Sequence, residues 1–129
     1  MSKNQPFIMD HMVILCSNLE QSLAFYHDLL PLLGFQQSRD HIYTNQQGIA
    51  LDFRQAEKLE QKYERYAPGL NHLGIQAHSL ADLETIRDEM NAKGYSMPDI
   101  QSFNDGHAIF IPDPDGLRVE IGYLHPKRD

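Results

Sequence analysis

The chain has 129 residues, of which 41% are hydrophobic and 22% are charged. This balance is typical of one globular domain and argues against wholesale disorder. Its formal net charge of −7 disfavours phosphate backbones and anionic membranes as partners, since no local basic stripe offsets it.

The single cysteine, Cys16, excludes an internal disulfide and a disulfide-stapled secreted framework. The longest apolar runs are far shorter than the roughly 20 residues of a membrane helix. The first residues, MSKNQPFIMDHM, lack the pattern of a signal peptide. We therefore expect a cytoplasmic protein with no membrane partner.

The first half of the chain predicts a strand, a helix and further short strands. Residues 7–15, FIMDHMVIL, are almost continuously apolar and indicate a buried strand. Asn18 is a plausible cap for a helix with one apolar face, in which Pro31 should disrupt the last turn and Gly34 should end it. Strand-like runs follow at residues 42–44 and 48–54.

A charged segment, QAEKLEQKYERYAP at residues 55–68, joins the two halves. Its composition favours a linker that could form a short solvated helix. The alternative is a lid in which Tyr63 and Tyr66 cover a ligand.

The second half repeats the landmarks of the first. His11 corresponds to His72, and Asn18 to Ser79, at a common offset of 61 residues; GIALDF at 48–53 matches GLRVEI at 116–121 at an offset of 68. Each half therefore predicts a strand, a helix and a meander of about three strands. We expect one α+β domain over residues 1–129, with module one at about 7–54, a linker at about 55–68 and module two at about 69–123.

The repeat places four candidate metal ligands at matching positions. Alternate residues of a strand face opposite sides, so Asp52 and Glu120 should lie on the faces turned away from the helices. His11 and His72 stand near the starts of the first strands. If a pseudo-twofold axis relates the modules, these imidazoles and carboxylates converge into a set that suits a borderline divalent metal.

Other residues carry weaker signals. Asp52 is one methylene shorter than Glu120, so it binds the ion directly, binds through water, or falls outside the site. Arg54 and Arg118 share the carboxylate side and either hold an anionic substrate group or are ordinary surface charges. His41 is expected to be exposed. The string PDPDG at 112–116 indicates a turn between two strands.

The sequence resembles the vicinal oxygen chelate superfamily of glyoxalase I, fosfomycin-resistance proteins, extradiol dioxygenases and bleomycin-binding proteins. The motifs that carry the resemblance are DHMVI, LEQSLAFYHDLL with the later GF, NHLGIQ and IFIPDPDGLRVEI. It implies paired βαβββ modules that form a U-shaped, mixed-sheet cleft of the glyoxalase-like fold, often in a homodimer.

The resemblance also implies a ligand set. His11, His72 and Glu120 match the superfamily's ligand positions for a divalent metal, here Zn, Ni, Mn, Co or Fe. Asp52 falls where glyoxalase I-like members carry a fourth ligand, which is commonly Glu.

Three functions follow from this resemblance. The first is a metal-dependent lyase or isomerase resembling glyoxalase I, with Glu120 or Asp52 as catalytic proton shuttle for a small oxygen-chelating substrate. The second is an iron-dependent extradiol-type dioxygenase that uses two histidines and one carboxylate. The third is a non-catalytic binding or resistance protein that sequesters a small molecule.

Overall fold

The computed structural model describes residues 4–124. Both halves follow the predicted order of a strand, a helix and three strands. Module one contains β1 (His11–Cys16), α1 (Leu19–Leu29), the 3-10 helix η1 (Leu30–Leu33), β2 (Gln36–Arg39), β3 (Ile42–Thr44) and β4 (Ala50–Gln55). Module two contains β5 (His72–Gln76), α2 (Leu80–Ala92), β6 (Gln101–Phe103), β7 (Gly106–Pro112) and β8 (Arg118–Leu124).

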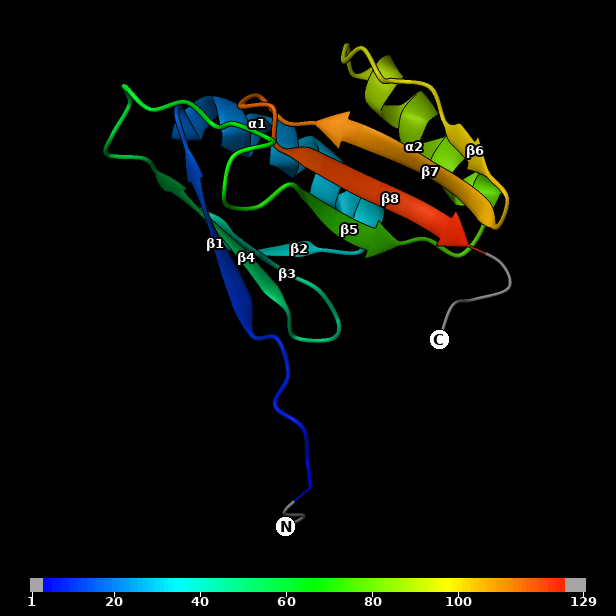
Figure 1. The fold of residues 1–129 in the computed structure, drawn as a ribbon, viewed down its shortest axis with the longest axis horizontal. Helices are drawn as coiled ribbons and strands as arrows, with labels where there is room; N and C mark the ends of the chain where they lie inside the picture. Colours follow the sequence, from blue (N-terminus) through cyan, green and yellow to red (C-terminus); the bar gives the residue numbers. More distant parts are fainter. Residues whose placement is uncertain (1–3, 125–129) are drawn as a thin grey trace.

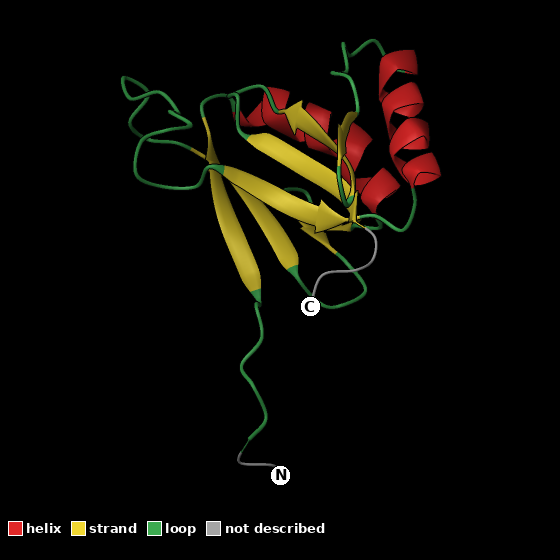
Figure 2. Ribbon diagram, turned by 45° about the vertical axis from the view of Figure 1, so that its right-hand side comes forward, coloured by secondary structure: helices red, strands yellow, loops and turns green. Residues whose placement is uncertain are grey.

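Each module builds one four-stranded mixed sheet with the same topology. The strand orders are β1-β4-β3-β2 in sheet A and β5-β8-β7-β6 in sheet B. The first strand of each sheet is parallel to its neighbour, and the remaining pairs are antiparallel. Both helices lie toward the top of the view in Figure 2, with most of the strands below them. The expected α+β class and the two βαβββ units are confirmed.

Local signals explain the helix boundaries. The side chain of Asn18 accepts a hydrogen bond from the Gln21 N–H at the start of α1, as an N-cap does. Ser79 does the same for Asp82 at the start of α2. Pro31 converts the end of α1 into η1, and Gly34 closes it with a φ of 88°, a left-handed conformation that glycine adopts without a Cβ clash.

The apolar strand faces pack on the helices in one continuous core. Phe53 on β4 and Ile121 on β8 are 0% and 1% exposed. Burying each such side chain stabilises the fold by about 1.5–3 kcal/mol. The helices contribute Tyr26, Leu29, Leu83 and Met90, all fully buried.

A buried hydrogen-bonded turn ties the modules together. The hydroxyl of Tyr26 on α1 donates to Asp113 of the PDPDG turn over 2.7 Å, and Asp113 also accepts the backbone N–H groups of Asp115 and Leu117. Burial raises the pKa of both Tyr26 and Asp113. Ser17 adds to this connection, because its backbone N–H and its hydroxyl both donate hydrogen bonds to the Asp115 carboxylate.

Two expectations were wrong. The first strand begins at His11, whereas residues 7–9 are exposed and lead away from the body of the molecule (Figure 1). Their strand partner is missing because β4 begins at Ala50, opposite His11. The linker forms no helix but turns and bends. Tyr63, which donates to the carbonyls of Leu70 and Asn71, holds it in this folded-back course.

Within residues 4–124, no helix has the length and apolar character that crossing a membrane requires.

Candidate metal centre

The two candidate histidines are held in the same way. Nδ1 of His11 lies 2.7 Å from the Asp10 carboxylate, and Nδ1 of His72 lies 2.7 Å from Oδ1 of Asn71. The amide of Asn71 is oriented by its donation to the carbonyl of Arg65. In each case the side chain just before the histidine accepts a hydrogen bond from Nδ1–H, which leaves a lone pair on Nε2.

Glu120 is brought to His72 by the pairing of β5 with β8. Gly74 is the register partner of Glu120, so the histidine lies diagonally across on the same face. Oε1 of Glu120 is 2.9 Å from Nε2 of His72. Because Nδ1 carries the hydrogen, this contact sets a ring lone pair against a carboxylate oxygen. Only a proton or a cation between the two atoms makes such a contact favourable.

Asp52 has different partners. Its Oδ1 accepts from Nδ1 of His41 over 2.7 Å, and its Oδ2 accepts two hydrogen bonds from the Arg54 guanidinium, at 2.8 and 3.1 Å. The Arg54 hydrogen bonds, helped by the one from His41, hold the pKa of Asp52 below its usual value despite burial. The sequence predicted Asp52 as a possible fourth ligand and His41 as an exposed residue, but the two are bonded to each other and the Asp52 side chain is 8% exposed.

The four predicted ligands therefore separate into two half-sites. His72 and Glu120 meet on sheet B, whereas His11 and Asp52 share a face of sheet A but bond to different partners, Asp10 for His11 and both His41 and Arg54 for Asp52. Val13, the register partner of Asp52, occupies the place that Gly74 occupies in module two. Within the described part of the chain, no three His, Cys, Asp or Glu side chains are grouped closely enough to hold a metal ion.

The two arginines also differ. The guanidinium of Arg118 lies 4.8 Å above the ring of Phe110 and donates to Oδ1 of Asn71 over 3.3 Å. Its Nε is buried without a hydrogen-bond partner in the described residues. Phe110 also meets His72 edge-on at 5.8 Å. Arg118 thus stands beside the His72–Glu120 pair with donor capacity to spare, while Arg54 is engaged by Asp52.

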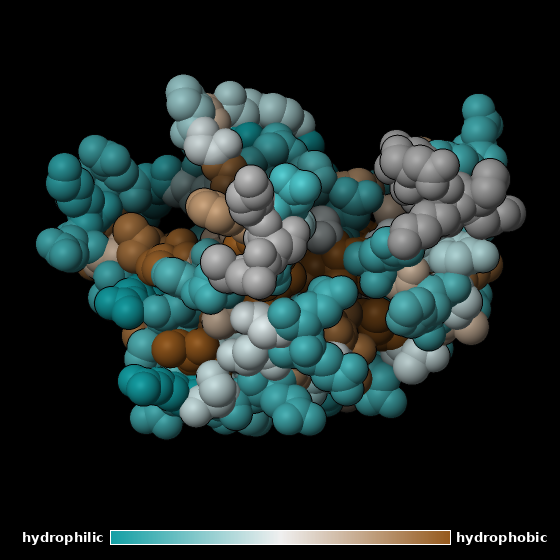
Figure 3. Space-filling model, turned by 90° about the horizontal axis from the view of Figure 1, so that it is seen from below, coloured by the Kyte–Doolittle hydropathy of each residue, from teal (hydrophilic) through white to brown (hydrophobic). Residues whose placement is uncertain are grey.

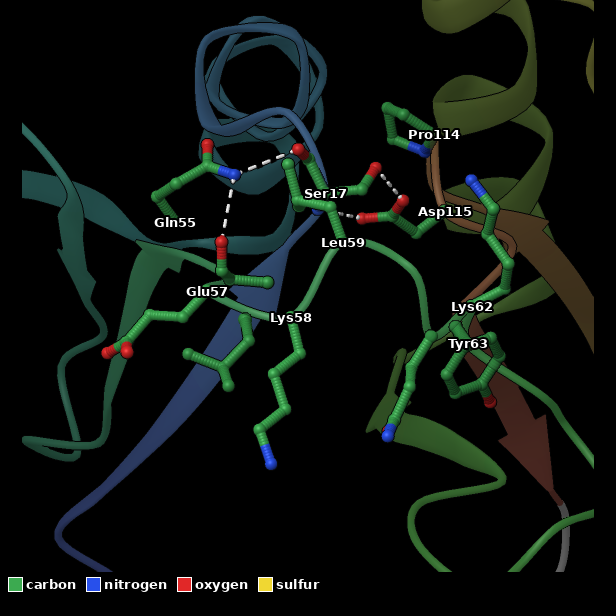
Figure 4. A pocket seen from close by; sticks show the side chains of 12 residues that line it. Ser17, Gln55, Glu57, Lys58, Leu59, Lys62, Tyr63, Pro114 and Asp115 are labelled. Carbon is green, nitrogen blue, oxygen red and sulfur yellow. Dashed lines mark hydrogen bonds between the residues drawn. The ribbon is translucent and has the colours of Figure 1, made fainter.

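The linker borders a cavity of about 770 Å³ at the far end of β1. Figure 4 shows Lys58, Leu59 and Tyr63 of the linker around it, with Ser17 bonded to Asp115 on the opposite wall. Tyr66, the other predicted lid residue, is 78% exposed. The linker contacts the half-site of module two through Asn71, which both Tyr63 and the Arg65 carbonyl bind.

Comparison with known proteins decides the family. The profile of the Glyoxalase/Bleomycin resistance protein/Dioxygenase superfamily matches residues 8–121. The chain belongs to this superfamily. It is 33% identical to the Bacillus subtilis protein YqjT over 123 residues, which cover 88% of this chain and 96% of YqjT.

Solved structures of the superfamily share the fold. A candidate glyoxalase from Bacillus halodurans is 28% identical, with a TM-score of 0.74 over 90% of this chain and 95% of that one. Lactoylglutathione lyase from Agrobacterium tumefaciens is 17% identical, with a TM-score of 0.63 over 94% and 96% of the two chains. The superfamily's description spans several activities, so membership alone leaves the reaction open.

The residues present fit a divalent metal in part. The nitrogens of His11 and His72 and the carboxylate of Glu120 are the donor types that borderline divalent ions take. The facing lone pairs of His72 and Glu120 are suited to a shared cation. Asp52 does not fit, because its two oxygens are already bonded and Arg54 places a positive charge against it.

Proposed function

We propose that this protein is a metal-dependent lyase or isomerase that acts on a small substrate with neighbouring oxygens. The observation that carries the proposal is the His72–Glu120 contact of 2.9 Å, in which two lone-pair donors face each other. The oriented Nε2 of His11 supplies the third donor. We place Asp52 outside the ligand set.

A bound divalent ion would polarise a carbonyl oxygen of the substrate. The protein's own residues would orient the substrate. Arg118, next to the His72–Glu120 pair, is the candidate for an anionic group, because its guanidinium makes a single hydrogen bond, to Asn71, among the described residues. Phe110 supplies an apolar wall under that arginine. Arg54 is the weaker candidate for this role, since Asp52 already occupies it.

We propose that two copies of the chain form the complete site. His11 and the His72–Glu120 pair lie on different sheets, and no described cluster joins them. On β1, Val13 and Leu15 are 46% and 63% exposed on the same face as His11, and Phe7 and Ile8 just before the strand are 102% and 78% exposed. Figure 3 shows brown apolar areas open to solvent on the underside. A second copy that covers β1 could bring its own His72 and Glu120 to His11.

A second function is favoured by the position of Asp52. With Asp52 removed, two histidines and one carboxylate remain, which is the donor set of iron-dependent oxygenases. Such an enzyme would consume oxygen with a catechol when loaded with ferrous iron. A sequestering protein would turn over neither class of substrate.

The test begins with protein purified without chelator. Metal content is measured by mass spectrometry, and the loaded protein is then assayed with the hemithioacetal of methylglyoxal and glutathione and with catechol. The proposal predicts about one metal per His11–His72–Glu120 set and turnover of the hemithioacetal. Turnover of catechol with oxygen uptake would favour the oxygenase instead. Protein that binds no Zn, Ni, Mn, Co or Fe would contradict both.

A further inference from the structure

His41 forms a histidine–carboxylate pair from a turn whose counterpart in module two, at residues 104–105, holds no histidine. It stands in the turn between β2 and β3, and its Nδ1 lies 2.7 Å from Oδ1 of Asp52. An ionised carboxylate only accepts hydrogen bonds, so Nδ1 carries the hydrogen. In the neutral ring, Nε2 then holds a lone pair. Among residues 4–124 no hydrogen bond to this nitrogen is formed, and the side chain is 38% exposed.

The pair lies next to a proposed metal ligand. Asp52 is the register partner of Val13, and Ala50 is the partner of His11, so His11 and Asp52 occupy one face of sheet A two positions apart. Strand alternation places their side chains on the same side. His41 reaches that side through its hydrogen bond to Asp52.

Arg54 completes the arrangement. By occupying Oδ2 of Asp52 it fixes the carboxylate, so that Oδ1 faces His41. A carboxylate held in this way selects the tautomer of a histidine and fixes the ring's orientation. The carboxylate that the repeat predicts as a metal ligand thus serves a neighbouring imidazole instead.

We propose that His41 is the catalytic acid–base group of the reaction proposed above, and that Asp52 is its positioning residue. The inference rests on that proposed function. Nε2 of His41 takes the proton from the carbon next to the substrate carbonyl, and the C–H electron pair moves toward the carbonyl oxygen. The same proton returns from Nε2 to the former carbonyl carbon, while the hydroxyl proton of the first carbon passes to the other oxygen, so that the first carbon becomes the new carbonyl. The step is an isomerisation that needs no oxidant or reductant.

Substitution of His41 tests the catalytic role. In metal-loaded H41A the metal content should equal that of the unsubstituted protein, while kcat for the methylglyoxal–glutathione hemithioacetal falls about 100-fold or more. Added imidazole should restore part of the activity. If H41A fails to fold, H41Q is measured in its place. For the positioning residue, D52N should lower kcat with little change in KM. The matched control is H78A, because His78 is also exposed and lies at the start of α2. Activity of H41A or H41Q within threefold of the control would overturn the inference.

A second measurement is independent of turnover. Diethyl pyrocarbonate modifies accessible unprotonated histidine nitrogens, and acetohydroxamate is a bidentate oxygen chelator that binds metal. In the loaded protein, acetohydroxamate should protect His41 from modification while His78 reacts as before.

The combined outcomes separate the two proposals. Protection of His41 without hemithioacetal turnover would contradict the proposed reaction but support the placement of His41 at the ligand site. Turnover with an unprotected His41 would support the proposed function and overturn the inference. Protein that binds no metal would overturn both.

Discussion

The two modules share a backbone plan and differ in how they use their carboxylates. Each has a capped helix, a terminal glycine in the left-handed region and the same turn before its last strand. In that turn Asn45 accepts the N–H groups of residues 47 and 49, as Asp113 accepts those of 115 and 117. Yet Glu120 meets Nε2 of a histidine, whereas Asp52 meets an Nδ1 and an arginine. The duplicated fold thus preserves backbone geometry while side-chain chemistry diverges.

The largest difference we predict concerns the equivalent turns. Asp113→Ala should lower the free energy of unfolding by about 2–4 kcal/mol, because the buried Tyr26 hydroxyl and two backbone N–H groups lose their acceptor. Asn45→Ala, in the more open turn, should cost only about 1 kcal/mol. Urea unfolding followed by circular dichroism measures both. Equal losses would show that the tie to α1 contributes nothing to stability.

The next prediction concerns the support of His72. Asn71→Ala should weaken metal binding about 10- to 100-fold, since the ring loses the acceptor that sets its tautomer. Asn71→Asp should stay close to the unsubstituted protein, because it reproduces the Asp10–His11 pair of module one. Isothermal titration with Zn²⁺ compares the variants. An Asn71→Ala protein with unchanged affinity would disprove the supporting role.

A smaller effect should follow from making module two resemble module one. A Cβ at Gly74 meets nothing within 4 Å, so Gly74→Ala should be tolerated. Gly74→Val would place branched methyls beside His72 and Glu120, as Val13 does beside Asp52, and should weaken Zn²⁺ binding roughly tenfold, or about 1.4 kcal/mol. The same titration applies. If the valine and alanine variants bind Zn²⁺ equally, the absence of a side chain at Gly74 does not explain why Glu120 reaches His72 while Asp52 does not reach His11.

The smallest effect is a pH dependence of stability. Because Arg54 holds the pKa of Asp52 below its ordinary value, the folded state gains stability that is present above the unfolded pKa of about 3.9. That gain is lost as the pH falls through the lower, folded pKa. Asp52→Asn should therefore be less stable than the unsubstituted protein near neutral pH and approach it in acid. Urea midpoints at several pH values test this, with Arg54→Gln expected to lose part of the same contribution.

The sequence predicted the fold well because local signals determine it. Helix caps, helix-ending glycines and apolar alternation act over a few residues. The offsets of 61 and 68 show that the same signals recur at matching positions in the second half. The linker was mispredicted as a possible helix, because the Tyr63 hydroxyl bonds the carbonyls of Leu70 and Asn71, beyond the reach of a helical turn, and these contacts leave no mark in the composition.

The candidate site was less predictable. Strand alternation placed Asp52 and Glu120 on corresponding faces, and β5–β8 pairing brought Glu120 to His72. The partners of Asp52 could not be inferred in the same way, since His41 lies in the β2–β3 turn and the equivalent β6–β7 turn of module two contains no histidine. Arg54, two residues along the same strand face, was the one available signal that the carboxylate has another use.

In the proposed site, module two supplies a carboxylate ligand and module one does not. Zn²⁺ affinity and stoichiometry in Glu120→Ala and Asp52→Ala, each folded and compared with the unsubstituted protein, test this difference directly. We expect Glu120→Ala to lose affinity at least 100-fold, whereas Asp52→Ala should keep its affinity within about threefold and its full stoichiometry. An Asp52→Ala protein that loses metal as completely as Glu120→Ala would contradict this expectation.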